Sequence, residues 1–340
     1  MYSAGDKNWG RQTRNTDKQK KLLRKTRAHP RAVAPVNTIT AVHLTIQKCN
    51  TLDIKRSRFL NQIKPQLPAL KTQIKIHKGN EPIQPVVNNI YAPTHKVAKF
   101  LSKWLTKNLQ LSNTYVIHNA TQLAHDLTHL RIGNTSRLIT LDIKDLYVNI
   151  PIEETIHITK TLLTDKKTDS LIIKQTCSLL RTILMQNYFQ FDNKFFQPNK
   201  GIAMGSPISD TEAEILLQYY KDSLVKNNLE NTNIKFYNRY VDDILIIYDE
   251  QKTTADTILS YMNTTHNHLK FKHTDEENQT ISFLDLLITR NQDHLNINIY
   301  QKPTTTDTTI HYYSSHPVEH KYAAFRFLLN RLHQSTSVTR

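Results

Sequence analysis

The stretch from residue 137 to 143 is short, apolar and rich in β-branched residues, which predicts a buried β-strand. Side chains of a strand alternate between its two faces. One face would carry Ile139, Leu141 and Ile143, and the other Leu138, Thr140 and Asp142. A carboxylate at the end of a buried strand is costly unless something pairs with it. Asp142 is therefore a candidate functional residue.

A second strand-like pattern covers residues 236–248, where two apolar runs flank Asp242 and Asp243. This arrangement predicts a β-hairpin with two carboxylates at its tip. Taken alone, an Asp-Asp pair is most often a solvated turn. Buried β-type residues on both sides, together with Asp142 upstream, favour a functional site instead.

Helical spacing of apolar residues predicts helices over residues 94–109 and 120–130, and a third after Pro151. A hairpin is expected over residues 187–196. Ser206 and Pro207 predict the start of a further helix, as its cap and its first-turn proline. The order strand, helix, hairpin, helix, hairpin favours an α+β fold, with helices packed on one face of an antiparallel sheet.

The 340 residues carry a formal net charge of +16, which favours polyanionic partners such as nucleic acid or an acidic membrane surface. No apolar run approaches the roughly 18 residues of a membrane span, so a membrane role is disfavoured. The two cysteines form no CxxC pair, and neither GxGxxG nor GxxxxGK[ST] is present. These absences exclude a cysteine-based zinc site and glycine-rich nucleotide loops of those two kinds.

The acids suggest a specific chemistry. Asp142, Asp242 and Asp243 would converge if their strands are neighbours in the sheet. Carboxylate oxygens are the ligands that hard divalent cations prefer. Two such cations, roughly 4 Å apart, can activate an attacking oxygen and stabilise a leaving pyrophosphate. The sequence thus predicts a two-metal site for nucleotidyl transfer.

Five segments in order resemble the polymerase motifs of reverse transcriptases, and among these most closely the Penelope-like retroelements, whose polymerase is related to telomerase. The resemblance covers roughly residues 65–333. It rests on Lys75–Lys78, Leu141–Pro151, Gly201–Ser209, Tyr240–Asp243, and the stretch Phe283–Ile288 with Tyr300–Thr304. It implies a right-hand polymerase with fingers at 35–136, palm at 137–290 and a thumb-like region at 291–340, preceded by a basic, flexible arm at 1–34.

The resemblance also implies roles for individual residues. The three aspartates would hold two Mg²⁺ ions, with Mn²⁺ as an alternative. Tyr147 would lie under the incoming sugar and select deoxynucleotides. The remaining nucleotide- and template-binding residues would be Lys75, Lys78, Met204, Gly205 and Ser206. Lys270 is a candidate for the acid that protonates pyrophosphate, with a solvated lysine as the open alternative.

The implied partners are an RNA template, a DNA primer and dNTPs. No GIY-YIG motif occurs in this sequence, so nuclease activity is not expected from it. The implied location is the nucleus, after synthesis in the cytoplasm. The family usually has proline, arginine and glutamine where this chain has Ile74, Gln84 and Pro198.

These departures leave a second hypothesis open, a catalytically weakened or inactive nucleic-acid-binding relic. A third, a basic structural RNA-binding protein, does not explain acids at the ends of buried strands.

Overall fold

The computed structural model describes residues 28–30, 35–74, 83–111, 115–117, 119–192, 194–225, 234–303 and 309–336. The chain divides into two compact units that interleave along the sequence. The first unit contains Met1–Ser112 and Asp145–Ser223, and the second contains Asn113–Lys144 and Leu224–Arg340. No helix among the described residues has both the length and the apolar character needed to cross a bilayer.

The first unit contains a five-stranded sheet in the order β1-β6-β5-β2-β3. Its strands are β1 (Ala28–Pro30), β2 (Ala69–Ile74), β3 (Ile83–Asn88), β5 (Phe189–Phe191) and β6 (Lys194–Pro198). The predicted hairpin at 187–196 corresponds to β5 and β6, which pair antiparallel. Strand β1 pairs with β6 although its residues lie inside the stretch expected to be a flexible arm.

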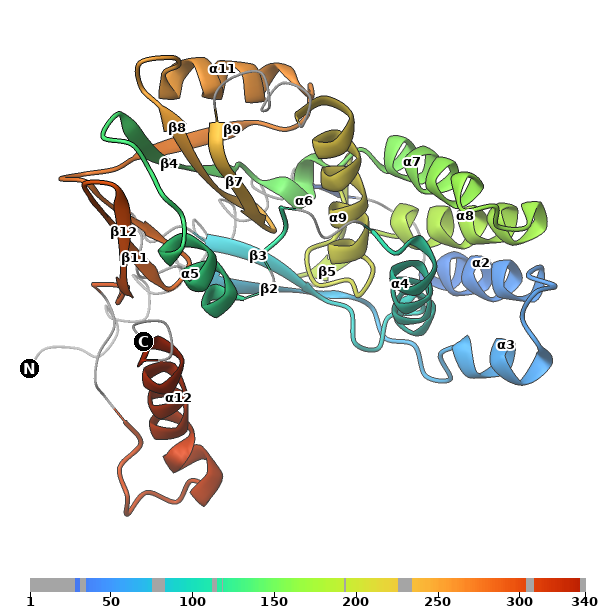
Figure 1. Cartoon of the computed structure of the whole chain (residues 1–340). Coiled ribbons are helices and arrows are strands. Elements are labelled where there is room, and N and C mark those ends of the chain that lie inside the picture. Colours follow the sequence, from blue (N-terminus) through green and yellow to red (C-terminus); the bar gives the residue numbers. More distant parts are fainter. Residues whose placement is uncertain are drawn as a thin grey trace, which may run out of the picture. The chain divides into compact units, whose positions relative to one another are not determined.

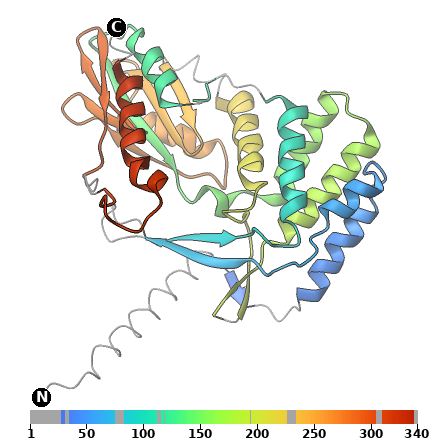
Figure 2. The same cartoon turned by 90° about the horizontal axis from the view of Figure 1, so that it is seen from below.

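Within the helices of the first unit (Figure 2), α8 contacts α2, α4 and α7. They are α2 (Pro35–Gln47), α3 (Ile54–Leu60), α4 (His95–Leu109), α6 (Leu146–Asn149), α7 (Ile152–Asp165), α8 (Ser170–Met185) and α9 (Ser209–Tyr220). Helix α4 confirms the predicted helix at 94–109, with Val97, Leu101 and Leu105 on its buried face.

The start of α9 differs from the prediction, because the helix begins at Ser209 and neither Ser206 nor Pro207 caps it. The residues before Ser209 form turns, in which the Ser206 amide donates to the Ala203 carbonyl over 3.1 Å. The Ser209 hydroxyl donates to the same carbonyl over 2.8 Å. These bonds hold the chain in a loop for two residues beyond the expected cap.

The second unit contains a four-stranded sheet in the order β7-β8-β4-β9 and a three-stranded sheet in the order β10-β11-β12. The first is built from β4 (Ser136–Ile143), β7 (Ile234–Tyr240), β8 (Asp243–Asp249) and β9 (Phe271–Asp275). The second is built from β10 (Thr280–Phe283), β11 (Leu286–Asn291) and β12 (His294–Ile299). Among its described residues, the unit also contains the helices α5 (Ala120–Thr128), α11 (Ala255–Thr264) and α12 (Val318–Thr336).

The two faces of the four-stranded sheet pack against different partners (Figure 1). Ile139 and Leu141 belong to a core that includes Ile258 and Met262 of α11. On the opposite face, Leu138 belongs to a core shared with α5 and the three-stranded sheet. The alternation predicted for residues 137–143 is therefore confirmed, and Asp142 shares the face of Leu138.

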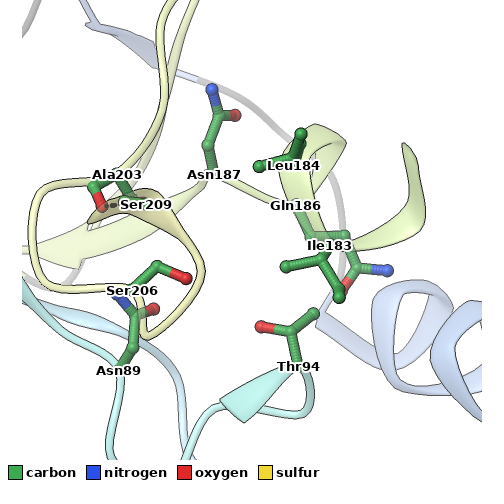
Figure 3. Close-up of a pocket in the computed structure, with 9 residues that line it drawn as sticks. All are labelled: Asn89, Thr94, Ile183, Leu184, Gln186, Asn187, Ala203, Ser206 and Ser209. Carbon is green, nitrogen blue, oxygen red and sulfur yellow. Dashed lines mark hydrogen bonds between the residues drawn. The ribbon is translucent and has the colours of Figure 1, made fainter. Parts of the chain in front are cut away.

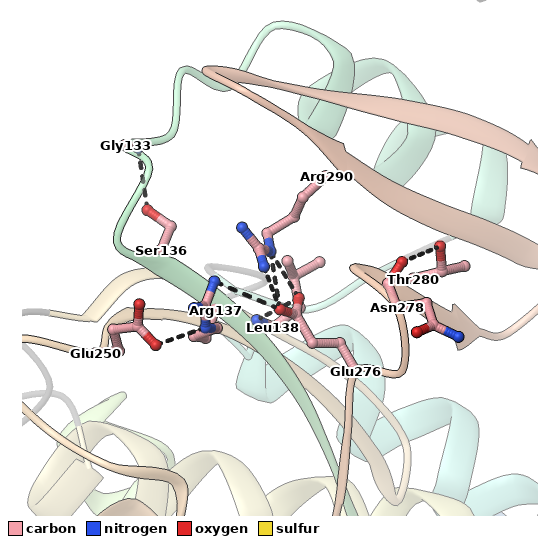
Figure 4. A network of polar contacts seen from close by, with 9 residues as sticks. All are labelled: Gly133, Ser136, Arg137, Leu138, Glu250, Glu276, Asn278, Thr280 and Arg290. Carbon is pink, nitrogen blue, oxygen red and sulfur yellow. Dashed lines mark hydrogen bonds and ion pairs between the residues drawn. The ribbon is translucent and has the colours of Figure 1, made fainter.

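A buried ion pair links the two sheets of the second unit (Figure 4). Arg290 of β11 donates twice to Glu276, which follows β9, with the shortest contact at 2.6 Å and both side chains only 9% exposed. Glu276 also accepts the Leu138 amide of β4 over 3.2 Å. Arg137 contributes a weaker contact to Glu276 at 4.0 Å. One carboxylate thus ties β11 to the strand that carries Asp142.

We expect Arg290→Met to destabilise the protein by on the order of 3 kcal/mol, because it leaves the Glu276 carboxylate buried without its main partner. The matched control is Arg131→Met. Its pair with Asp293 spans 3.0 Å but is 78% and 62% exposed, so the loss there should stay below about 1 kcal/mol. Urea unfolding of both variants measures the difference. Equal losses would contradict a structural role for the buried pair.

The aromatic residues of the C-terminal region are not buried as expected. Tyr322 and Phe325 share one face of α12 at the helical spacing that is typical of a core face, and yet they are 43% and 48% exposed. Tyr312 and Tyr313, which precede the helix, are also exposed. The sequence spacing correctly predicted a helix with an apolar face, but no described element covers that face with the density of a core.

Candidate active site

Strand register brings two of the predicted aspartates together in the second unit. Asp142 of β4 is the direct cross-strand partner of Asp243 of β8. On the other side of Asp142, its partner in β9 is Lys272, and the partner of Asp243 in β7 is Tyr240. Cross-strand partners point to the same face, with Cβ atoms about 5 Å apart. Tyr240, Asp243, Asp142 and Lys272 therefore form one row across the sheet.

The third aspartate lies in the turn between β7 and β8. Since Tyr240 pairs with Asp243, the loop consists of Val241 and Asp242 alone. The Asp242 carbonyl accepts the Ile143 amide over 3.1 Å, which fastens the turn to the end of β4. Val241 has φ of 53°, a region that a β-branched residue rarely occupies. Such strain costs on the order of 1–3 kcal/mol and persists where the surrounding structure enforces it, as at functional sites.

The donor set fits hard divalent cations. Like charges directly opposite one another destabilise a sheet, so the facing carboxylates of Asp142 and Asp243 need a compensating positive charge. Lys272 supplies one on one side, and bound cations would supply the rest. Within the described residues, no three His, Cys, Asp or Glu side chains are placed as a ready-made metal cluster. The support for a metal site comes from the strand register, which places the Asp142 and Asp243 backbones side by side. The carboxylate side chains would converge when cations bind.

Lys272 is a residue that the sequence reasoning missed. The predicted lysine, Lys270, donates its ammonium to the Asn263 carbonyl over 3.4 Å, and its own carbonyl accepts the Lys144 amide. Lys272 stands two residues further along, beside Asp142 and exposed. Residues two apart in a strand point to the same face. The sequence pattern alone therefore could not decide whether Lys270 or Lys272 lies beside Asp142.

The predicted nucleotide loop, Gly201–Ser209, lies in the first unit and is fitted closely to two backbone segments. A Cβ atom on Gly201 would come within 2.4 Å of the Val148 carbonyl oxygen, and one on Gly205 within 2.4 Å of the Val87 carbonyl oxygen. Both glycines have positive φ, 80° and 105°. The Met204 carbonyl accepts the Val87 amide over 2.9 Å. Only glycine fits these two positions.

The same loop closes a small polar cavity with α4 and α8 (Figure 3). Its volume is about 10 Å³, which suits a single water molecule and not a nucleotide. The polar side chains of Ser206, Asn89 and Thr94 line it. The residues around this cavity therefore support the loop, and the Ser206 side chain faces the cavity.

Tyr147 is oriented by α9. Its hydroxyl donates to the Asp210 carboxylate over 2.6 Å, and its carbonyl accepts the Ile202 amide over 2.8 Å. Tyr147 thus lies beside the loop of Gly201, as the motif order suggested, in the first unit. Lys75 and Lys78 lie outside the described residues.

Glu212 of α9 is a further residue that sequence reasoning missed. It is fully buried, and burial raises the pKa of its carboxyl to about 8. The Thr159 hydroxyl of α7 donates to Oε2 over a long 3.5 Å, and Oε1 has no hydrogen-bond partner. A neutral carboxylic acid suits this environment. Its place among Ile208, Ile215 and Leu216 was the available signal, since these apolar residues share its helix face.

Comparison with known protein families identifies a family for most of the chain. Residues 57–293 match the family described as Reverse transcriptase (RNA-dependent DNA polymerase). No curated protein matches the chain. That family stretch includes Asp142, Asp242, Asp243 and the loop of Gly205.

The solved structures that are similar to this chain include polymerases. A telomerase of Candida albicans, solved in complex with the TWJ fragment of telomeric RNA, is 12% identical, with a TM-score of 0.52 over 72% of this chain and 48% of that one. An apo telomerase of Candida tropicalis truncated from its C-terminal domain is 13% identical, with a TM-score of 0.47 over 70% and 56%. The RNA-dependent RNA polymerase of BmCPV is 13% identical, with a TM-score of 0.46 over 80% and 26%.

The chain spans about half the length of those telomerase chains. At such identities, the likeness to the Candida albicans telomerase shows a polymerase fold of mixed helices and antiparallel sheets. The matching family stretch covers most of the 340 residues. The chain therefore belongs to the reverse transcriptase family of RNA-dependent DNA polymerases.

Proposed function

We propose that this chain is the active reverse transcriptase of a retroelement of the Penelope-like kind, extending a DNA primer on an RNA template by two-metal nucleotidyl transfer. The observation that carries the proposal is the register of β4 and β8, which sets Asp142 beside Asp243 and places Asp242 in the adjoining turn. Paired carboxylates at the ends of buried strands serve little structural purpose, because they repel each other.

Asp142, Asp242 and Asp243 would hold the cations, two Mg²⁺ or Mn²⁺ ions. When bound, these ions lower the barrier by activating the primer 3′ oxygen and neutralising the charge of the pyrophosphate. The chain's own contribution is a rigid frame. The strands β4 and β8 fix two carboxylates by their hydrogen-bonded register, and the Ile143 amide fixes the turn that carries the third.

The experiment that tests the proposal is primer extension. An RNA template with an annealed DNA primer, dNTPs and Mg²⁺ should yield full-length complementary DNA. Extension with ribonucleotides alone, on the same template, would overturn the assignment. The nuclear location after cytoplasmic synthesis belongs to the same proposal, and it rests on the retroelement resemblance and on the basic N-terminal residues.

Tyr147→Ala is expected to raise ribonucleotide incorporation relative to deoxynucleotide incorporation by about 10- to 100-fold. By resemblance, the ring lies under the incoming sugar, and its removal admits a 2′-hydroxyl, a change worth about 1–3 kcal/mol of discrimination. The control is Tyr147→Phe, which keeps the ring and loses only the bond to Asp210. Competition between dNTPs and rNTPs in single-nucleotide addition measures the ratio. A larger effect in the Phe variant would contradict the steric account.

Lys272→Gln is expected to slow nucleotide addition by about 10- to 100-fold, because the lysine beside Asp142 supplies positive charge, and potentially a proton, as the pyrophosphate departs. Lys270→Gln is the matched control and should change the rate less than about threefold, since that ammonium is bonded to Asn263. Single-turnover rates across a pH series separate the two. A greater loss for Lys270→Gln would restore the assignment made from the sequence.

The relic hypothesis remains the second candidate function, and two departures from the family favour it. Gln84 replaces an arginine, and this removes fixed positive charge that lysine can only partly replace. Pro198 replaces a glutamine and ends β6, where it pairs with Ala28. The intact aspartates favour activity. Binding of a primer–template without extension would favour the relic.

A further inference from the structure

Helices α3 and α4 of the first unit contact each other and carry a strongly unbalanced charge. Residues 53–110 contain eleven Lys or Arg and only two carboxylates, Asp53 and Glu81. Asp53 accepts the Arg56 amide and so caps α3. Within α3 and α4 themselves, no acid offsets the positive charges.

Four lysines of α4 line up on the face opposite its buried side chains. Lys96, Lys99, Lys103 and Lys107 fall within roughly 80° of one another at 100° per residue. They extend over roughly 16 Å of helix. Lys99, Lys103 and Lys107 are exposed, and none makes an ion pair with any residue that the structure describes. Lys96 instead donates to the Asn61 carbonyl over 3.4 Å. Like charges at this helical spacing repel each other, so a bound anion would stabilise the row of Lys99, Lys103 and Lys107.

Aromatic rings are interleaved with these charges. Phe59 of α3 is 68% exposed, and the Lys96 ammonium lies 5.1 Å from its ring centre. Arg56 lies 5.6 Å from the ring centre of Phe100, on α4. An exposed ring such as Phe59 beside a basic row suits single-stranded nucleic acid, since a base can stack on the ring while phosphates meet the lysines. A duplex keeps its bases stacked internally and gains less from Phe59.

We infer that this surface binds a single-stranded segment of RNA. We define the α3–α4 face as Lys55, Arg58, Phe59, Lys99, Lys103 and Lys107. The bound RNA would be the unpaired part of the template, an identification that rests on the proposed function. Binding itself does not depend on catalysis, because none of these residues belongs to the aspartate row.

The test measures binding of a fluorescent single-stranded RNA to the full chain, in EDTA and without nucleotides, over a series of salt concentrations. The test variant is Lys99→Gln/Lys103→Gln/Lys107→Gln. A charge-matched control changes three exposed lysines of α7, α8 and the residue after α7, Lys160→Gln/Lys166→Gln/Lys174→Gln. Both variants lose the same net charge, so a difference in their RNA affinity shows that the position of the lysines matters.

We expect the test variant to bind about 10-fold or more weakly at low salt, with the slope of log affinity against log salt reduced by about 2. The control should lose less than about threefold. Phe59→Ala should weaken binding of the single strand by about fivefold or more and leave duplex binding unchanged. Equal losses in the test and control variants would overturn the proposal.

Two further outcomes are decisive. If the test variant loses binding to vesicles containing phosphatidylserine but keeps its affinity for RNA, the face is a membrane surface and the proposal fails. Because the assay contains EDTA, a chain that cannot extend primers can still bind RNA through this face. Failure of the proposed polymerase and failure of this surface are therefore distinguishable.

Discussion

Asp142→Asn is expected to reduce nucleotide addition by about 10³-fold or more while leaving the protein folded. The substitution preserves shape and removes one of the charges that would hold the cations. Metal-ion catalysis contributes several kcal/mol, and each 1.36 kcal/mol corresponds to a tenfold change in rate. Asp142 is exposed at the end of β4, so no buried packing is lost. Single-turnover addition of one dNTP measures the effect.

The same substitution carries an opposite prediction for stability. Asp142 and Asp243 are direct cross-strand partners, and like charges in this arrangement destabilise a sheet by up to about 1 kcal/mol. In the absence of divalent cations, Asp142→Asn should therefore raise the free energy of unfolding by several tenths of a kcal/mol. A residue whose removal stabilises the fold and abolishes activity is present for function.

The control is Asp256→Asn, on an exposed carboxylate in the first turn of α11. This substitution makes the same chemical change away from the row that contains Asp142 and Asp243. It should alter the rate of nucleotide addition less than about twofold. Its stability should fall slightly, because an acid in the first turn suits the helix dipole. If Asp142→Asn retained a tenth or more of the wild-type rate, the metal-site assignment would be wrong.

Glu212→Gln is expected to remove most of a pH dependence of stability and to stabilise the protein at pH 8. Burial raises the pKa of the Glu212 carboxyl from 4.5 to about 8. Below about pH 4.5 the group is protonated in both folded and unfolded chains, and its neutral form is accommodated. Between pH 4.5 and 8 the unfolded chain releases the proton while the folded chain retains it, so stability falls as pH rises.

The size of this effect follows from the shift. A rise from 4.5 to about 8 corresponds to a loss of up to about 5 kcal/mol, complete once the pH exceeds the folded value. Glutamine has nearly the same shape and does not ionise. At pH 8 the variant should therefore be more stable than the wild type by about 2–5 kcal/mol, and at pH 4.5 the two should be similar.

Urea unfolding at several pH values measures this difference. The matched control is Glu319→Gln, an exposed carboxyl in the first turn of α12. It should leave the pH dependence within about 0.5 kcal/mol of the wild type. The prediction also identifies the cause, because among the described residues Glu212 has only the long hydrogen bond from Thr159 to compensate for the burial of its carboxyl group. Parallel pH profiles for Glu212→Gln and the wild type would contradict it.

Much of the local structure was predictable, since local patterns decide it. The strand at Asp142, the hairpin at Asp242–Asp243 and the helix at 95–109 appear where apolar periodicity placed them. Asp142 and the Asp242–Asp243 pair are separated by about a hundred residues, and the sequence could say only that these candidate residues would meet if their strands are neighbours. The structure supplies that pairing, Asp142 opposite Asp243.

Register was the part that the sequence could not supply. The pairing of β4 with β9 is non-local, and it decides that Lys272 and not Lys270 stands beside Asp142. Slipping the pairing by two residues would keep the same faces and change the neighbour. Sequence position alone therefore could not show which lysine, Lys270 or Lys272, lies beside Asp142.

Tertiary contacts overrode two other predictions. Ser206 and Pro207 are good helix-start residues, but the close fit of Gly205 to Val87 keeps the chain in a loop until Ser209. The aromatic face of α12 has the spacing of a core helix and yet is exposed. Periodicity indicates that a face is apolar and does not indicate which element, if any, covers it.

We propose that three aspartates hold the metals of a working reverse transcriptase, and primer extension on an RNA template is the decisive measurement. The purified chain is compared with its Asp242→Asn/Asp243→Asn variant, in Mg²⁺, in Mn²⁺ and in EDTA, with primer–template binding measured alongside. We predict extension by the wild type only, in the presence of either metal, with similar binding by both. If neither chain extends a primer in Mg²⁺ or Mn²⁺ while both bind it equally, the account is contradicted and the chain is a relic, in which Gln84→Arg with Pro198→Gln is the rescue to attempt.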